Sequence, residues 1–190
     1  LADGVIGQMM EKVVLPEQRP RLTNEEVMAR CPWATFGKLK HRGPNIVTSL
    51  ELDPAEMEKR NIHLQQKYAE IEEKEVRYEE IHCDDAEYLI VAFGSCARIA
   101  QKAMEEARAE GIKVGLLRPI TLWPFPSKAI AERSRQVKGI LTVELNAGQM
   151  VEDVRLAVEC KVPVEYFGRL GGIVPDPDEV VTALKEKIIK

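Results

Sequence analysis

The residues most able to bind a ligand lie where predicted strands end. Gly94 and Ser95 follow the apolar run YLIVAF and open a predicted helix, so their backbone N–H groups can bind an anion. Arg98 lies one turn further along this helix and adds a positive charge. A phosphate or carboxylate site is one interpretation, and simple capping of the helix by Ser95 is the more common arrangement.

Charged and amide side chains stand at the ends of the next two predicted strands. Arg118 follows one strand and Glu144 ends another, with Asn146 and Gln149 just beyond. Ligand and partner contacts gather at the carboxyl ends of parallel strands. We therefore expect Arg118 to pair with Glu144 at this edge and to hold the two amide side chains in place.

The stretch RPITLWPFP, residues 118–126, contains three prolines and two aromatic residues, Trp123 and Phe125. Proline fixes φ and has no N–H group, so the preceding strand cannot continue through it. A connection between a strand and a helix needs only a few residues. Contact with another domain or subunit is one interpretation of this long apolar loop. Capping of the domain's own core by both rings is the other, and the sequence favours neither.

The sequence contains no motif of a self-contained active site. It has no P-loop, no GxSxG elbow and no HExxH pair, and the glycines of GRLGG (168–172) lack the spacing of a dinucleotide fingerprint. The cysteines are scattered, whereas iron–sulfur and zinc sites take clustered thiolates; they are Cys31, Cys83, Cys96 and Cys160. We therefore predict no catalytic residue, no metal site and no cofactor bound to this chain, and reduced cysteines typical of a cytoplasmic protein.

Composition excludes two classes of partner. The formal net charge is −4, with 27 Lys and Arg against 31 Asp and Glu, which argues against a nucleic-acid role. No apolar run is long enough to cross a membrane.

Strands and helices alternate from residue 76 onward. The expected strands are 88–93, 113–117, 139–145 and 162–167, and the expected helices are 95–110, 127–136, 147–160 and 176–190. Asp176 and Glu179 form a capping box around Pro177 at the start of the last helix. This alternation predicts an α/β domain over 76–190 with a three-layer, mostly parallel sheet.

The first part of the chain is less regular. Residues 1–53 show no sustained period, and a solvated connector is one interpretation. Their large apolar residues, among them Val13, Trp33 and Phe36, favour a segment that wraps over another domain. Residues 54–75 predict one long amphipathic linking helix with Asp53 as its N-cap. The chain opens on Leu1 in a stretch typical of a strand leaving into a loop, so we expect a fragment of a longer protein.

Two long stretches, FGSCARIAQKAMEEARAEGIKVGLLRPITLWPFP and TVELNAGQMVEDVRLAVE, carry a resemblance to a known family. They resemble the second domain of the α subunit of 2-oxoacid:ferredoxin oxidoreductases, most closely the branched-chain (2-oxoisovalerate) type and next the 2-oxoglutarate type. LADGVIGQMME is similar to the end of the pyrimidine domain of that subunit, and YFGRLGGIVPDPDEV continues the resemblance to the end of the chain. A more distant similarity is to the carboxyl-terminal domain of transketolases, which implies that fold for residues 76–190.

The resemblance implies an enzyme that oxidatively decarboxylates a 2-oxoacid to an acyl-CoA. Thiamine diphosphate, Mg²⁺, iron–sulfur clusters and coenzyme A serve the holoenzyme, and ferredoxin accepts the electrons. The groups that contact the cofactor and substrate are implied to lie upstream of Leu1 or in other subunits. This chain is then a structural and assembly domain without an active site of its own. A free-standing α/β module that binds a phosphorylated ligand at Gly94–Arg98 is the alternative.

Overall fold

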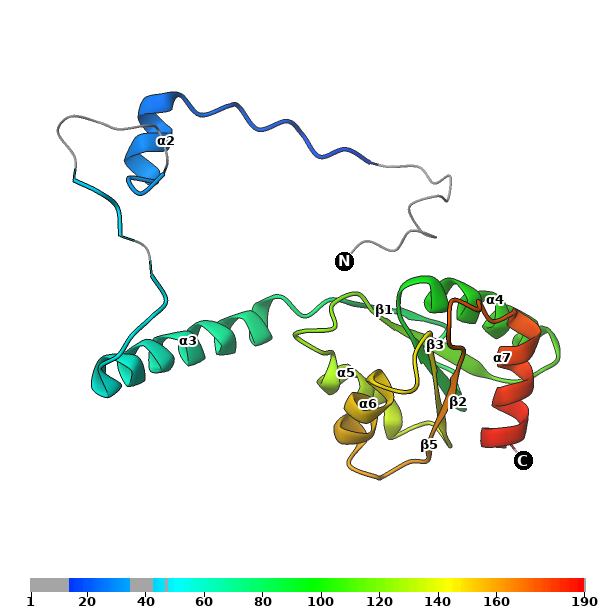
Figure 1. The fold of residues 1–190 in the computed structure, drawn as a ribbon. Helices are drawn as coiled ribbons and strands as arrows, with labels where there is room; N and C mark the ends of the chain where they lie inside the picture. The colour runs from blue at the N-terminus through cyan, green and yellow to red at the C-terminus, as the bar shows by residue number, and fades with distance from the viewer. Residues whose placement is uncertain (1–13, 35–42, 47, 190) are drawn as a thin grey trace. The chain divides into compact units, whose positions relative to one another are not determined.

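The structure is a computed structural model that describes residues 14–34, 43–46 and 48–189 (Figure 1). The chain divides into two compact units, one from Gln65 to the end of the chain and one over Met10–Leu64. Each unit is described by itself below.

The larger unit is built on a five-stranded sheet with the strand order β1-β3-β2-β4-β5. The strands are β1 (Tyr78–Ile81), β2 (Tyr88–Ala92), β3 (Val114–Pro119), β4 (Ile140–Glu144) and β5 (Val164–Gly168). Four strands run parallel, and β1 pairs antiparallel with β3 at one edge. The prediction of a mostly parallel sheet is confirmed. The sequence did not predict β1 as a strand.

Helices cover both faces of this sheet (Figure 1). They are α4 (Gly94–Ala109), α5 (Ser127–Ser134), α6 (Met150–Val158) and α7 (Pro177–Leu184), and a π-helical turn over Lys185–Ile189 follows α7. Buried residues of α4 and α7 form one apolar cluster with the sheet, and buried residues of α5 and α6 form a second cluster. The predicted three-layer α/β architecture is therefore confirmed.

Of two predicted helix starts, one is confirmed and one is wrong. At α7, the Asp176 and Glu179 side chains form the expected capping box, with Pro177 in the first turn. At α4, the predicted N-cap Ser95 is wrong, because the cap is Phe93 and the helix already begins at Gly94. Gly94 has a φ of +57°, so the chain turns from strand to helix at this glycine, one residue earlier than expected. Ser95 is buried inside the first turn.

The smaller unit contains α2 (Asn24–Arg30) and the first part of α3 (Pro54–Lys74). The sequence predicted α3 almost to the residue, and Asp53 Oδ1 accepts hydrogen bonds from the N–H groups of Ala55 and Glu56 as an N-cap. Helix α2 was not predicted, although Thr23 and Glu26 form a capping box at its start. Neither helix has a fully buried residue.

The wrapping interpretation of residues 1–53 stays a prediction. Two of the residues on which it depends, Val13 and Phe36, lie outside the described residues. Two other large apolar residues of this segment are exposed to solvent, Trp33 at 63% and Ile46 at 85%. Across the described ranges of the chain, no helix is long and apolar enough to cross a membrane.

Candidate functional site

The parallel strands bring the predicted site residues to one edge of the sheet. Strands β2, β3, β4 and β5 run in the same direction, so their carboxyl ends meet there. The predicted site residues at or beyond these ends are Gly94, Ser95, Arg98, Arg118, Trp123, Phe125, Glu144, Asn146 and Gln149. We call this the carboxyl edge of the sheet.

Glu144 is the most constrained residue of the carboxyl edge. It is fully buried at the end of β4. Its Oε2 accepts hydrogen bonds from the N–H groups of Met150 and Gln149 at 2.8 and 3.2 Å, and its Oε1 accepts one from Val151 N–H at 2.9 Å. The carboxylate thus binds the exposed N–H groups at the start of α6, where the helix dipole also favours a negative charge.

Asn146 extends this network into the loop before α6. Its Nδ2 donates to Glu144 Oε2 at 3.1 Å, and its Oδ1 accepts from Gly148 N–H at 2.7 Å. Its carbonyl oxygen accepts the hydroxyl hydrogen of Tyr166 on β5. Burial, and then the charge of Glu144, raise the pKa of Tyr166, so the phenol stays a donor. These three hydrogen bonds of Asn146 fix the loop over 145–149.

The predicted pair between Arg118 and Glu144 is wrong. Among the described residues, Arg118 Nη1 donates to Glu79 Oε2 at 3.1 Å, while the Glu144 oxygens bind the α6 amides. The reason is strand β1, in which Glu79 lies directly opposite Arg118 across the antiparallel pair. Gln149 lies at this edge too, but its backbone N–H group, and not its side chain as expected, donates to Glu144 Oε2.

The two aromatic rings of the loop after β3 lie in different surroundings, and its interpretation as a contact with another domain or subunit stays a prediction. Phe125 packs against the apolar cluster of α5 and α6, as the core interpretation expects. Trp123 is 55% exposed and meets Tyr68 of α3 edge to face, with the ring centroids 5.7 Å apart. Thr121 fixes the loop, because its hydroxyl donates to Pro124 O at 2.8 Å and accepts from Arg77 N–H at 3.0 Å.

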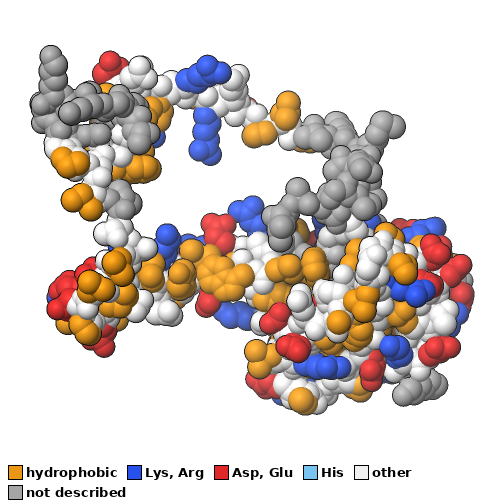
Figure 2. All heavy atoms as spheres, in the orientation of Figure 1, with side chains coloured by type: hydrophobic (Ala, Val, Ile, Leu, Met, Phe, Trp, Pro, Cys, Tyr) orange, Lys and Arg blue, Asp and Glu red, His pale blue; other side chains and the backbone are white. Residues whose placement is uncertain are grey.

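Large apolar side chains are exposed along the same edge. Those between 42% and 58% exposed are Ile120, Leu122, Trp123, Leu145, Leu170, Ile173 and Val174, which follow β3, β4 and β5. We call them the apolar rim. Figure 2 shows hydrophobic side chains gathered between charged groups on the visible face of this unit. Exposed apolar groups with a polar surround are typical of protein contact surfaces.

Sequence reasoning missed four of the seven residues of the apolar rim. It considered the loop after β3 but not Leu145, Leu170, Ile173 or Val174. A signal for them was present, since each follows closely the end of a predicted strand.

The thiols and carboxylates of the described residues do not gather into a reactive site. No three His, Cys, Asp or Glu side chains in the described ranges could hold a metal ion together. Cys83 and Cys96 are buried, and Cys160 is exposed. Burial, with the nearby charge of Glu80, raises the pKa of Cys83 to about 11, which makes this thiol a poor nucleophile.

Comparison with curated proteins finds relatives among 2-oxoacid oxidoreductases. The chain is 46% identical over 98% of its length to the ketoisovalerate oxidoreductase subunit VorB of Methanothermobacter thermautotrophicus. It is 30% identical over 93% of its length to the 2-oxoglutarate synthase subunit KorA of Archaeoglobus fulgidus. The chain spans about half the length of these relatives, 51% and 49% respectively.

Two solved structures share the fold. A 2-oxoglutarate:ferredoxin oxidoreductase from Magnetococcus marinus matches 77% of this chain and 27% of its own, with a TM-score of 0.66 and 24% identity. A split-gene transketolase matches 58% of this chain and 40% of its own, with a TM-score of 0.51 and 22% identity. The predicted similarity to transketolase-type domains is thereby confirmed at the level of the fold.

A family model decides the assignment. The model described as pyruvate:ferredoxin oxidoreductase core domain II matches residues 86–180, which is half of the chain. The matched range begins just before β2 and ends within α7, so it contains all four parallel strands and the carboxyl edge. The chain therefore belongs to the pyruvate:ferredoxin oxidoreductase core domain II family.

Proposed function

We propose that this chain is part of a subunit of a 2-oxoacid:ferredoxin oxidoreductase that acts on branched-chain 2-oxoacids. The observation that carries the proposal is the 46% identity to a ketoisovalerate oxidoreductase subunit over 98% of the chain. The 2-oxoglutarate synthase subunit is less similar, at 30% identity. The complete enzyme oxidatively decarboxylates its substrate to an acyl-CoA and passes electrons to ferredoxin in the cytoplasm.

The catalytic groups of that enzyme belong to its other parts. Thiamine diphosphate with Mg²⁺ supplies the decarboxylation chemistry, and iron–sulfur clusters carry the electrons. The residues described here offer no iron–sulfur site, because no metal-binding cluster of His, Cys, Asp or Glu is found among them and their cysteines lie apart. We assign no step of the reaction to this chain.

The role of the chain is assembly. Residues 1–53 contain the end of a preceding domain and a connector, 54–75 the linking helix, and 76–190 the α/β domain. The carboxyl edge, with its apolar rim, contacts the remaining domains and subunits of the oxidoreductase. Two features support this role: the rim exposes apolar side chains on three consecutive loops, and the Glu144 network fixes one of those loops.

Substrate preference of the assembled enzyme tests the proposal. The complete subunit that contains this chain is purified with its partner subunits, and viologen reduction is followed with coenzyme A and one 2-oxoacid at a time. We expect kcat/KM for 2-oxoisovalerate to exceed that for 2-oxoglutarate or pyruvate by at least about tenfold. A preference for 2-oxoglutarate, or no 2-oxoacid-dependent reduction, would overturn it.

A thermal-shift titration of the 190-residue chain separates the proposal from a free-standing ligand-binding module. Coenzyme A, ATP and inorganic phosphate are the probes. We expect none of them to raise the Tm. A saturable rise that disappears in the Arg98→Ala variant would favour the module instead.

A further inference from the structure

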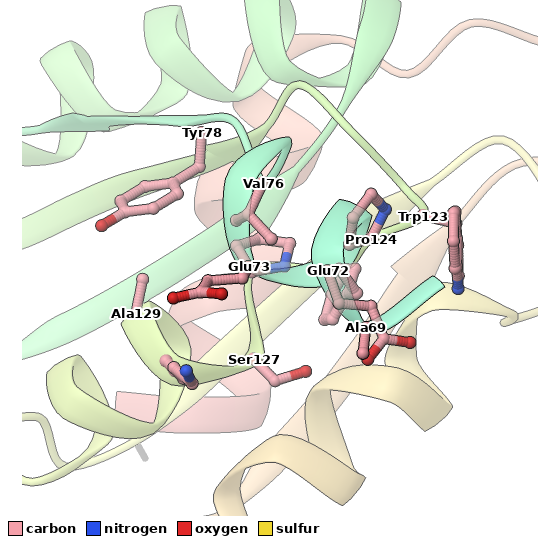
Figure 3. A pocket seen from close by; sticks show the side chains of 12 residues that line it. Ala69, Glu72, Glu73, Val76, Tyr78, Trp123, Pro124, Ser127 and Ala129 are labelled. Carbon is pink, nitrogen blue, oxygen red and sulfur yellow. The ribbon is translucent and has the colours of Figure 1, made fainter. Parts of the chain in front are cut away.

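A groove on the larger unit shares one residue, Trp123, with the apolar rim (Figure 3). Its volume is about 820 Å³. The last turns of α3 form one wall, and the end of the aromatic loop with the start of α5 forms the other. The lining residues are Ala69, Glu72, Glu73, Val76, Tyr78, Trp123, Pro124, Phe125, Pro126, Ser127, Lys128 and Ala129.

One wall of the groove is apolar and fixed. Trp123 and Phe125 alternate with Pro124 and Pro126, and proline restricts the backbone before any partner binds. The Trp123 ring is supported by its contact with Tyr68. A wall that is already ordered loses little conformational freedom when a ligand binds.

The opposite wall carries two carboxylates. Figure 3 shows Glu72 and Glu73 among the side chains that line the groove. Within the described part of the chain neither glutamate forms an ion pair, whereas their neighbours Glu70 and Glu75 pair with Lys74 and Arg77. Among the described residues that line the groove, Lys128 is the single basic one against Glu72 and Glu73, so their net charge is negative.

We propose that this groove binds an extended segment of a partner protein in which an arginine or lysine stands between proline or aliphatic residues. Extended proline-containing segments dock into grooves lined by aromatic side chains. The cation of such a segment can pair with Glu72 and Glu73 and lie against the Trp123 ring. The two carboxylates disfavour a phosphate or carboxylate ligand. This proposal rests on the groove alone and does not depend on the proposed oxidoreductase function.

Fluorescence of Trp123 tests this proposal directly. The chain has two tryptophans, so a Trp33→Phe background leaves Trp123 as the reporter. The probe is the acetylated peptide Ala-Pro-Leu-Pro-Arg-Pro-Leu-Ala, and the matched peptide has glutamine in place of arginine. We expect a saturable change in Trp123 emission with the arginine peptide and at least about tenfold weaker binding of the glutamine peptide.

Charge variants complete the experiment. The double variant Glu72→Gln with Glu73→Gln is expected to bind the arginine peptide about tenfold more weakly and the glutamine peptide unchanged. Glu70 lies on the same helix but does not line the groove, so Glu70→Gln is the matched control. We expect this variant to bind both peptides with unchanged affinity. Circular dichroism verifies that each variant is folded. No saturable change with the arginine peptide, or equal binding of both peptides, overturns the proposal.

Discussion

Replacing Glu144 by glutamine is expected to destabilise the larger unit strongly. The carboxylate is fully buried and accepts from the N–H groups of Gln149, Met150 and Val151 and from the Asn146 amide. A glutamine has only one acceptor oxygen. In its best orientation the oxygen keeps the partners of Oε2, and the new NH₂ group then faces Val151 N–H.

The magnitude follows from this loss. One charge-assisted hydrogen bond disappears, one buried N–H group loses its acceptor, and the remaining bonds become neutral. Together these effects cost about 2–4 kcal/mol of unfolding free energy. For a unit of this size, such a loss lowers the Tm by roughly 8–15 °C.

Thermal and urea unfolding of the 190-residue chain, followed by circular dichroism at 222 nm, measure the effect. Glu152→Gln is the matched control, because Glu152 is an exposed residue in the first turn of the same helix. We expect the control to change stability by less than about 0.5 kcal/mol. If Glu144→Gln changes stability no more than the control does, the Glu144 network is not what anchors α6.

Three further predictions concern the Cys83 thiol, the apolar rim and the ion pair between Arg118 and Glu79. The pKa of Cys83 is raised from 9.0 to about 11, so its contribution to stability is complete below pH 9 and is lost as the pH rises toward 11. Cys83→Ala is expected to make urea stability less dependent on pH between 9 and 11, and an unchanged dependence would contradict this. Leu122→Asp places a charge on the apolar rim and is expected to prevent copurification of the partner subunits. The control Leu156→Asp changes an exposed residue of α6 outside the rim, and the partner subunits are expected to copurify with it. Equal copurification of both variants would exclude the rim as the contact. Arg118→Ala removes the half-exposed pair with Glu79 and is expected to cost only about 0–1 kcal/mol in urea unfolding, so a much larger loss would show that this pair is more than a surface contact.

The sequence predicts the central architecture well because its signals there are local. Strand β2 (YLIVA) is an uninterrupted apolar run, since helices cover the sheet on both faces. The capping box of Asp176 and Glu179 is contained within four residues, and it appears in the structure as predicted.

The edge strand could not be predicted in this way. Strand β1 reads YEEI, and two adjacent glutamates disfavour a strand when taken alone. In the fold, Glu79 pairs with Arg118, and Glu80 pairs with Arg133 at 2.6 Å. Both partners are distant in sequence, so only the folded chain shows why these charges suit a strand.

The sequence predicted that these residues lie at strand ends, but it did not predict their contacts. The ends of parallel strands gather by topology alone, which placed Arg118, Glu144 and Asn146 on one edge. Their partners depend on strand order and on the start of α6. The sequence therefore predicted a charge pair where the structure has a buried helix cap.

The central claim is that this chain assembles the enzyme and does not contain its active site. Titration calorimetry of the folded 190-residue chain with thiamine diphosphate and Mg²⁺ tests this claim most directly. We predict no saturable heat of binding, because the proposed function places the groups that position the cofactor in other parts of the enzyme. Saturable binding that is abolished by a substitution at the carboxyl edge would contradict the claim and place the active site on this chain.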